Sequence, residues 1–243
     1  MGPETAVVTL SHVDYRSARI ADMERITTVV HDDGALMVWD LCHSVGSIPV
    51  ELDATHTDFA VGCTYKFLNA GPGAPGFLYV AEEHQTSLCQ PIPGWMSAED
   101  LYAMAPAHVP APGIRRMISG TPAITGLTGV AAGVELLGEA GIHRVRAKSL
   151  SLTRMAIALA DAWLTPMGFG LATPREDKLR AGHVTLSHPQ AKELAELLIS
   201  NGVIVDFRAP DGIRLGLSPL STSFTEVWCA LDRMWRLAKK FLP

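Results

Sequence analysis

The sequence lacks the features that mark several large classes of protein. Its cysteines lie far apart and form no CxxC pair, so neither a disulfide framework nor a zinc knuckle is indicated. The 20 Lys and Arg residues form no basic run and the net charge is −5, which argues against a surface that follows nucleic-acid phosphates. No apolar run approaches the roughly 18 residues of a membrane span, and residues 6–10 are too few for the apolar core of a signal peptide. We therefore expect a cytoplasmic protein that binds neither nucleic acid nor membrane.

The composition is that of a folded globular protein. With 243 residues, 48% of them hydrophobic and 19% charged, the chain can bury a core in one large or two modest domains. Apolar runs at residues 6–10, 35–39 and 59–61 predict buried strands, and residues 22–31 have helical spacing. A strand, a helix and a strand in this order form a βαβ unit. We therefore predict an α/β fold with a parallel or mixed sheet and helices on both faces.

The rest of the chain predicts a long loop and then a small α+β domain. Residues 90–112 are irregular and rich in proline, which is typical of a functional loop. We divide the chain into residues 1–138, a partial large domain with an interdomain helix, and residues 139–243. The expected elements are a strand at 77–80, helices at 123–137 and 142–164, a strand at 183–186, a helix ending at Ser200, strands at 203–207 and 213–217, and a last helix.

Several helix ends carry recognisable signals. Ser187 with Gln190, and Ser223 with Glu226, fit the spacing of capping boxes. Asn201 followed by glycine predicts a helix stop, and Gly138 and Gly141 are expected to separate the two long helices.

Residues 71–76 match the pattern GxGxxG, which is found in dinucleotide-binding sites. In such a site the glycines lead from a strand into a helix whose N-terminus meets the pyrophosphate. Here the glycines lead into the strand expected at residues 77–80, and Pro75 removes an amide donor. We therefore interpret this segment as a turn that lets the backbone pass close to a neighbouring group, and not as an NAD site.

Four polar side chains follow the ends of two predicted strands. Asp40 and His43 come after one strand, and Tyr65 and Lys66 come after the next. Ligands of open α/β sheets collect outside the carboxyl ends of the strands, so these groups should reach one edge. A carboxylate, an imidazole, a phenol and an amine are what pyridoxal 5′-phosphate (PLP) requires, with Lys66 forming a Schiff base. A turn-capping role stays open for Asp40 and His43, and no metal site is expected.

Arg214 lies within an apolar strand, where a charge costs free energy unless it is paired. Its planar guanidinium suits a bidentate bond to a substrate carboxylate, although a salt bridge with an Asp or Glu of the chain is the alternative. Trp95 and Thr121 are weaker candidates, because a tryptophan is more often packing and Thr-Pro is more often a helix start.

Taken together, these residues resemble kynureninase, a fold-type-I PLP enzyme related to the class V aminotransferases and the cysteine desulfurases. The most specific block is Tyr-Lys-Phe-Leu-Asn-x-Gly-Pro-Gly-Ala-Pro, at residues 65–75. The matching segments are residues 10–16, 39–44, 62–75, 93–95, 115–124 and 212–224.

The resemblance implies a role for each candidate residue. Lys66 would carry PLP and act as acid and base on the α-carbon of the substrate, and Asp40 would pair with the pyridinium. His43 would lie by the ring, Tyr65 by the phosphate, and Arg214 on the substrate carboxylate. Trp95 and Thr121 would reach the cofactor from a neighbouring subunit, because such sites are built at a homodimer interface. The implied reaction, part of tryptophan catabolism, is hydrolysis of L-kynurenine to anthranilate and L-alanine.

The family's chain is considerably longer at its N-terminus than this sequence. The additional part supplies the aromatic that stacks on the ring, a phosphate-binding loop and much of the sheet. We therefore expect a fragment, a truncated gene product or half of a split enzyme, which associates with another copy or with a second chain that supplies that part.

Two other functions stay open. One is a desulfurase or a transaminase of the same superfamily. Desulfurases need a mobile catalytic cysteine, for which Cys89 is the candidate. The other is a non-catalytic or partner-dependent subunit that keeps the fold.

Overall fold

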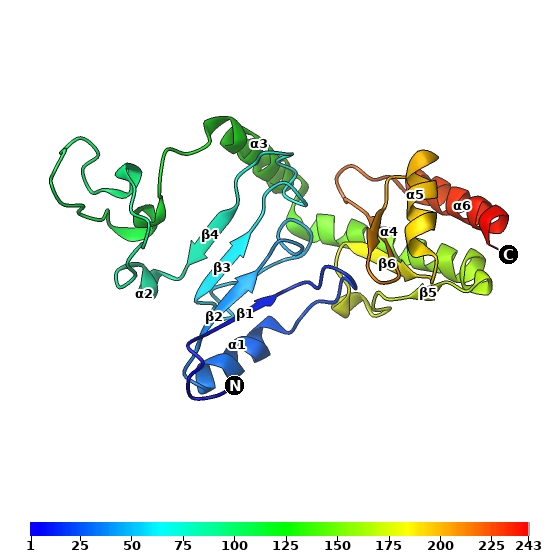
Figure 1. The fold of residues 1–243 in the computed structure, drawn as a ribbon, viewed down its shortest axis with the longest axis horizontal. Coiled ribbons are helices and arrows are strands. Elements are labelled where there is room, and N and C mark those ends of the chain that lie inside the picture. The colour runs from blue at the N-terminus through cyan, green and yellow to red at the C-terminus, as the bar shows by residue number, and fades with distance from the viewer. Residues whose placement is uncertain (243) are drawn as a thin grey trace. The chain divides into compact units, whose positions relative to one another are not determined.

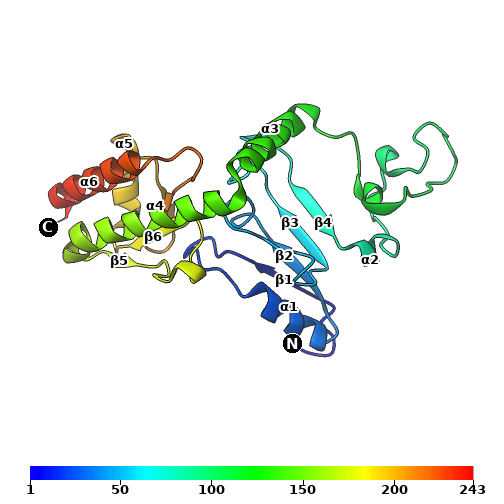
Figure 2. The ribbon, with the colours of Figure 1, turned by 180° about the vertical axis from the view of Figure 1, so that it is seen from behind.

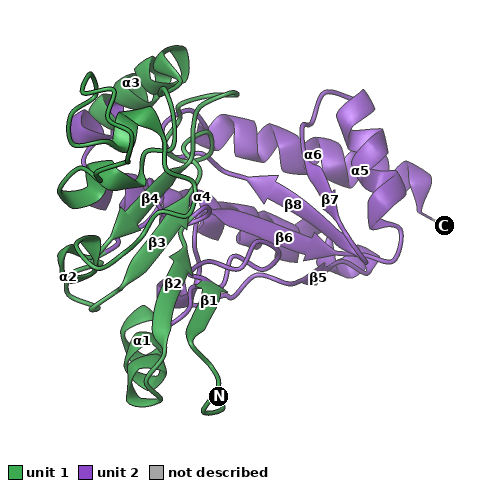
Figure 3. Ribbon diagram, turned by 60° about the vertical axis from the view of Figure 1, so that its left-hand side comes forward, with its two compact units in different colours: residues 1–10, 23–41, 51–135 green, residues 11–22, 42–50, 136–243 purple. Residues whose placement is uncertain are grey.

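The computed structural model describes residues 1–242 (Figure 1, and from behind in Figure 2). The chain divides into two compact units, coloured in Figure 3. Unit 1 comprises Met1–Leu10, Met23–Leu41 and Glu51–Glu135, and unit 2 comprises Ser11–Asp22, Cys42–Val50 and Leu136–Pro243. The division into residues 1–138 and 139–243 stays a prediction.

The sheet of unit 1 has the order β1-β2-β3-β4 (Figure 1). Strands β2 and β3 are parallel, whereas β3 and β4 are antiparallel. This arrangement confirms the predicted α/β fold with a mixed sheet. The strands are β1 Val7–Ser11, β2 Leu36–Asp40, β3 Phe59–Gly62 and β4 Phe77–Val80.

Helix α1, Met23–Asp32, joins β1 to β2 and is amphipathic. Its buried side chains are Met23, Thr27 and Val30, which share one face at helical spacing. The indole Nε1 of fully buried Trp39 donates to Thr27 Oγ1 at 3.0 Å. This bond satisfies the only polar atom of the Trp39 side chain and fixes α1 against β2.

Beyond β4 the chain is mostly irregular up to residue 123, as the proline content predicts. It contains α2 (Glu82–Gln85) and two 3₁₀ turns, Trp95–Ser97 and Gly113–Met117. The guanidinium of Arg115 donates to the carbonyls of Ala98 and Glu99 at 2.8 and 2.9 Å. The Arg115 side chain therefore provides hydrogen bonds to carbonyl groups that lie outside the regular strands and helices.

Helices α3 (Ile124–Ala140) and α4 (Ile142–Trp163) follow. Only Gly141, with φ +78°, separates them. Gly138 lies inside α3, so the prediction that it helps to separate the helices was wrong. A single residue in the left-handed region is enough to end a helix. None of the helices in residues 1–242 is both long and apolar enough to cross a membrane.

The sheet of unit 2 is antiparallel, in the order β5-β6-β8-β7. Helices α4 and α6 pack against each other, and side chains of both join the core cluster with those of β6, β8 and α5. The structure has here the expected small α+β arrangement. The elements are β5 Gly170–Leu171, β6 His183–Ser187, α5 Ala191–Ser200, β7 Asp206–Arg208, β8 Gly212–Gly216 and α6 Phe224–Phe241, with 3₁₀ turns at Thr165–Met167 and Asp177–Leu179.

The structure corrects two local predictions in this unit. Ser187 is the last residue of β6 and not a helix cap, because α5 begins only at Ala191. The residue before α5 is Gln190, and its backbone N–H donates to His188 Nδ1 at 3.1 Å. The strand predicted at residues 203–207 begins at Asp206, because its ladder with β8 starts there.

Two other helix-end predictions are confirmed. Ser223 caps α6 in a capping box with Glu226. Helix α5 stops before Gly202, whose φ is +79°.

Candidate active site

The two parallel strands of unit 1 end at the same edge of the sheet. Asp40, the last residue of β2, is in register with Val61 of β3, and the Leu41 N–H donates to the Val61 carbonyl at 2.8 Å. The loop that carries Tyr65 and Lys66 leaves β3 two residues beyond that pair. Half-buried Asp40 and this loop therefore start from one edge, where a ligand of an open α/β sheet binds.

The loop that carries Lys66 is held by hydrogen bonds within the loop itself. The Asn69 N–H donates to the Lys66 carbonyl at 2.9 Å, and the Thr64 hydroxyl donates to the Pro75 carbonyl at 2.6 Å. The ammonium of half-buried Lys66 lies 5.7 Å from the ring centroid of exposed Tyr65. The chain thus presents an amine and a phenol together on a fixed turn.

Three glycines of α3 bring the continuation of this loop against the helix. A Cβ added at Gly133 would lie 2.1 Å from the Leu68 carbonyl oxygen, and one at Gly129 would lie 2.5 Å from that of Ala70. At Gly126 it would lie 3.0 Å from the Gly73 carbonyl. Only glycine permits this approach. The glycine-rich segment after Lys66 is therefore a packing surface for α3, which agrees with its interpretation as a close-approach turn.

Trp95 and Thr121, 26 residues apart, contact each other. The exposed indole of Trp95 donates from Nε1 to Thr121 Oγ1 at 3.2 Å. Each residue alone was a weak candidate, and no pattern in the sequence indicated that they would meet. The bond joins them into one polar and aromatic surface of unit 1.

Arg214, on β8 in unit 2, is paired within the chain. Its Nη2 lies 2.7 Å from Asp206 Oδ2, its Nε donates to the same carboxylate, and its Nη1 donates to the Tyr15 carbonyl at 2.8 Å. The salt bridge that was the alternative interpretation therefore exists. Three of the five guanidinium N–H groups are used among the described residues, and one on Nη1 and one on Nη2 remain. That pair can still meet a carboxylate end-on.

A wider ionic cluster surrounds this pair and was missed by sequence reasoning. Arg208 also binds Asp206, at 3.0 Å, and Arg16 binds Asp211 at 3.1 Å. The Thr185 hydroxyl donates to the Arg16 carbonyl. With Arg214, three arginines face two aspartates, which leaves one positive charge in excess. The alternation Asp206-x-Arg208, which puts both on one face of a strand, was the available signal.

His43, also in unit 2, lies beside a second histidine. Its ring centroid is 5.5 Å from that of His183, at an interplanar angle of 58°. His183 is buried, and burial lowers its pKa to about 3, with further contributions from His43 and Arg214. His183 is therefore neutral at physiological pH.

We expect the stability of the chain to fall as the pH drops below about 6.5. Burial lowers the pKa of His183 to about 3 and that of His12 to about 4, so the unfolded chain takes up these protons first. The stabilisation is complete above the unfolded value and is lost as the pH falls toward the folded values. Urea unfolding between pH 7.5 and 4.5 measures it, and His183→Gln should flatten the slope. A slope that this substitution leaves unchanged would contradict the assignment.

Comparisons with known proteins agree with this arrangement. Residues 145–234 match the family described as the kynureninase C-terminal domain. Over 231 residues the chain is 41% identical to a kynureninase of Burkholderia mallei (strain SAVP1), covering 95% of this chain and 56% of that protein. A kynureninase of Pseudomonas fluorescens is also 41% identical, over 94% of this chain and 55% of its own length.

Solved structures show the same fold. The apo cysteine desulfurase of Thermococcus onnurineus NA1 superposes with a TM-score of 0.82 at 25% identity, over 97% of this chain and 60% of that one. A C-DES mutant with glycine covalently linked to its PLP cofactor gives 0.83 at 18% identity, over 96% and 62%. The chain spans a little over half the length of the curated relatives that it matches. By sequence and by fold, the chain is a relative of the kynureninases with the fold of the fold-type-I PLP enzymes.

Proposed function

We propose that the chain binds PLP and takes part in the hydrolysis of L-kynurenine, or a close analogue, to anthranilate and L-alanine. The observation that carries this proposal is the 41% identity to proteins named kynureninase over 95% of the chain. That span includes the edge where Asp40 and the Lys66 loop leave parallel strands. We also propose, on the same ground, that the protein acts in the cytoplasm in tryptophan catabolism.

The residues of unit 1 fit PLP chemically. Asp40 offers a half-buried carboxylate that would pair with the pyridinium nitrogen, and Lys66 Nζ is the amine to which the cofactor would attach. Tyr65 is exposed beside Lys66 and offers a hydroxyl donor to the phosphate. Trp95 and Thr121, already joined, would approach the cofactor of a neighbouring subunit. His43 would lie by the ring. When bound, PLP supplies an electron sink for the bonding electrons of the α-carbon.

The protein groups would then bind the substrate and move its protons. Arg214 would take the α-carboxylate through its two remaining N–H groups, while Asp206 and the Tyr15 carbonyl hold the guanidinium in place. Lys66 Nζ would take the α-proton and return it. Water would add to the side-chain ketone before the carbon–carbon bond breaks.

We propose that the active form contains another copy of the chain or a second chain. Strand β1 is at an edge of the unit 1 sheet and is exposed along most of its length. Large apolar side chains of this sheet are exposed on three other strands as well, and such surfaces usually mark an interface. The exposed apolar side chains of the four strands are Val7, Leu10, Leu36, Val61 and Leu78.

A desulfurase function has one observation in its favour, the similarity in fold to the cysteine desulfurase of T. onnurineus. Its candidate nucleophile, Cys89, is an exposed free thiol in the irregular segment after α2. The identity to that enzyme is 25%, against 41% to the kynureninases, so the hydrolase is the better supported function. If the wild-type chain released sulfide from cysteine and Cys89→Ser abolished this release, the desulfurase would become the better supported function.

The proposed function is tested by the appearance of anthranilate fluorescence when L-kynurenine is added to the purified chain with PLP. Arg214→Gln should raise KM about 10- to 100-fold, because a charge-assisted bond is worth about 1.5–3 kcal/mol. Arg236→Gln, on an exposed i,i+4 pair with Asp232, should leave KM unchanged. Absence of anthranilate would favour a non-catalytic subunit. Equal KM values for Arg214→Gln and wild type would remove Arg214 from the site.

A further inference from the structure

A buried carboxylate at the start of β3 is bound by groups from three other parts of unit 1. Asp58 Oδ2 lies 2.7 Å from His31 Nε2 and accepts the Met37 N–H at 2.7 Å, and Asp58 Oδ1 lies 2.7 Å from His84 Nε2. The Asp58 side chain is 5% exposed, and its pKa is lowered because the hydrogen bonds outweigh the effect of burial. An ionised carboxylate only accepts, so both Nε2 atoms carry the proton.

A second carboxylate completes a group of possible metal ligands. Glu83 Oε1 lies 3.8 Å from His84 Nε2, and the ligand atoms of Asp58, Glu83 and His84 all lie within 4.8 Å of one another. The His84 ring stacks on Phe59 with centroids 5.2 Å apart and an interplanar angle of 25°, which fixes its orientation. Glu83 is exposed, so the group is open to solvent on one side.

We propose that Asp58 Oδ1, Glu83 Oε1 and His84 Nε2 bind one divalent transition-metal ion, of which Zn²⁺ is the best fit. Zinc takes imidazole nitrogen and carboxylate oxygen, and two carboxylates balance its charge. His31 and the Met37 amide would stay on Asp58 Oδ2 as the outer hydrogen bonds that hold a metal-binding carboxylate. Water would take the open position.

The movement required of two of the three pairs of ligand atoms is small, and the third pair, Asp58 and Glu83, lies within 4.8 Å. Bonds of about 2.0–2.1 Å at a tetrahedral angle put two ligand atoms about 3.3 Å apart. The 2.7 Å contact between Asp58 and His84 must open, and the 3.8 Å contact between His84 and Glu83 must close, each by about half an ångström. The Zn²⁺ ion replaces the His84 Nε2 proton, which leaves to solvent.

Within unit 1, the site and Lys66 lie at opposite ends of β3. Asp58 precedes β3 and Lys66 follows it, while α2 comes after the end of β4 that pairs with Phe59. The Ala81 N–H also donates to the Asp58 carbonyl at 2.9 Å. A metal here would join α2 to the residue that precedes β3. Asp58 is distant in the sequence from the adjacent Glu83 and His84, which is why no metal pattern was recognisable there.

Zinc titration of the full chain by calorimetry, after treatment with a chelator, tests the proposal. We expect one saturable site and a rise in the melting temperature that EDTA reverses. Glu83→Gln should weaken binding about 10-fold and His84→Gln about 100-fold or more. Glu82→Gln changes a neighbouring exposed carboxylate on the same short helix and should have no effect. Because Glu83 is exposed, its variant tests binding without disturbing folding.

Binding to the exposed thiols of Cys89 and Cys229 is the main competing outcome. Co²⁺ distinguishes them, because thiolate ligands add intense near-ultraviolet charge-transfer absorption that a site of nitrogen and oxygen does not give. The proposal is overturned if no saturable binding occurs, if the Co²⁺ spectrum shows thiolate, or if Glu83→Gln and His84→Gln bind as the wild type does. The readouts need no turnover, so they are independent of the proposed function.

Discussion

Lys66→Ala is expected to abolish both the visible absorbance of the chain with PLP and any turnover of L-kynurenine. Lys66 Nζ is the only amine on the loop that leaves the edge shared by β2 and β3. Without Lys66 the cofactor has no covalent attachment there, and no amine of this loop remains to remove and return the α-proton of the substrate. Loss of such a group costs about 10²–10⁴-fold in rate, and loss of the attachment adds to this.

Lys178→Ala is the matched control for this prediction. The Lys178 side chain is 80% exposed in unit 2, and its ion pair with Glu176 is 3.6 Å long. Its removal should leave absorbance and rate as in the wild type. If Lys66→Ala retained the visible absorbance, the assignment of Lys66 would be refuted, whatever the rate.

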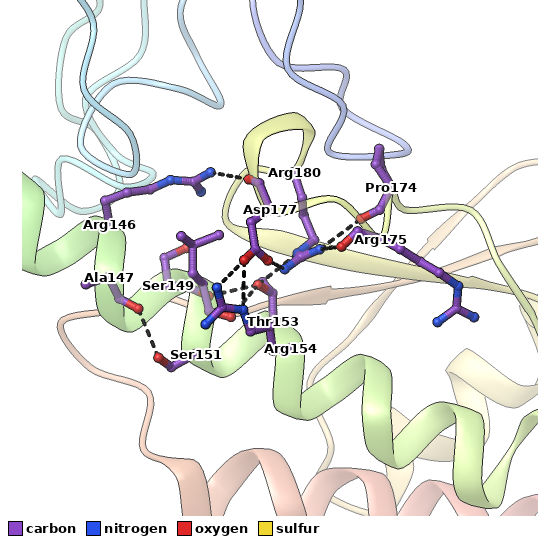
Figure 4. Close-up of polar contacts among 11 residues, drawn as sticks. Arg146, Ala147, Ser149, Ser151, Thr153, Arg154, Pro174, Arg175, Asp177 and Arg180 are labelled. Carbon is purple, nitrogen blue, oxygen red and sulfur yellow. Dashed lines mark hydrogen bonds and ion pairs between the residues drawn. The ribbon is translucent and has the colours of Figure 1, made fainter.

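Asp177→Ala is expected to destabilise unit 2 by about 3 kcal/mol, because it leaves a buried arginine without its counter-ion. The fully buried Arg180 donates from Nε to Thr153 Oγ1 at 3.0 Å and from Nη1 to the Pro174 carbonyl at 3.0 Å, and its Nη2 binds Asp177 (Figure 4). Arg154 binds the same carboxylate. The value is placed at the low end for such a pair because Asp177 is one-third exposed.

Asp161→Ala is the control, since it also removes the aspartate partner of an arginine in an ion pair. Its partner Arg175 has a side chain that is 61% exposed, so the loss should be below about 1 kcal/mol. Urea unfolding at pH 7 measures both variants. Equal effects would contradict the view that burial of Arg180 decides the cost.

The Asp177 contribution also depends on pH. Hydrogen bonds from Arg154, then from Arg180, hold the pKa of Asp177 below its usual value despite partial burial. A carboxyl with a lowered folded pKa stabilises the chain above its unfolded pKa, and this contribution is lost as the pH falls through the folded value. The difference between wild type and Asp177→Ala should therefore shrink in acid.

Much of the fold was predictable because local patterns determine it. The four strands of unit 1 and the helix after β1 follow from apolar runs and helical spacing, and each lies within a residue or two of its predicted place. The misplaced start of the strand at Asp206 has a physical reason. Val203 and Val205 are buried and Ile204 between them is exposed, so these residues have the alternating pattern of a strand without a ladder partner. The apolar pattern of a sequence indicates which side chains are buried, but it does not indicate which residues pair in a β-ladder.

The candidate site was predictable only where its residues are neighbours in the sequence or follow paired strands. Asp40 and the Lys66 loop share an edge because β2 and β3 are parallel, which the βαβ order implied. The bond between Trp95 and Thr121, and the pairing of Arg214 with Asp206, depend on how distant segments fold together. The same holds for the group around Asp58.

The central claim, that Lys66 is the attachment site of PLP, is tested most directly by trapping. The full chain is incubated with PLP, reduced with borohydride, digested and mapped by mass spectrometry. We predict a single phosphopyridoxyl group, on the peptide that contains Lys66. Modification spread over the other lysines, or none at Lys66, would contradict the account.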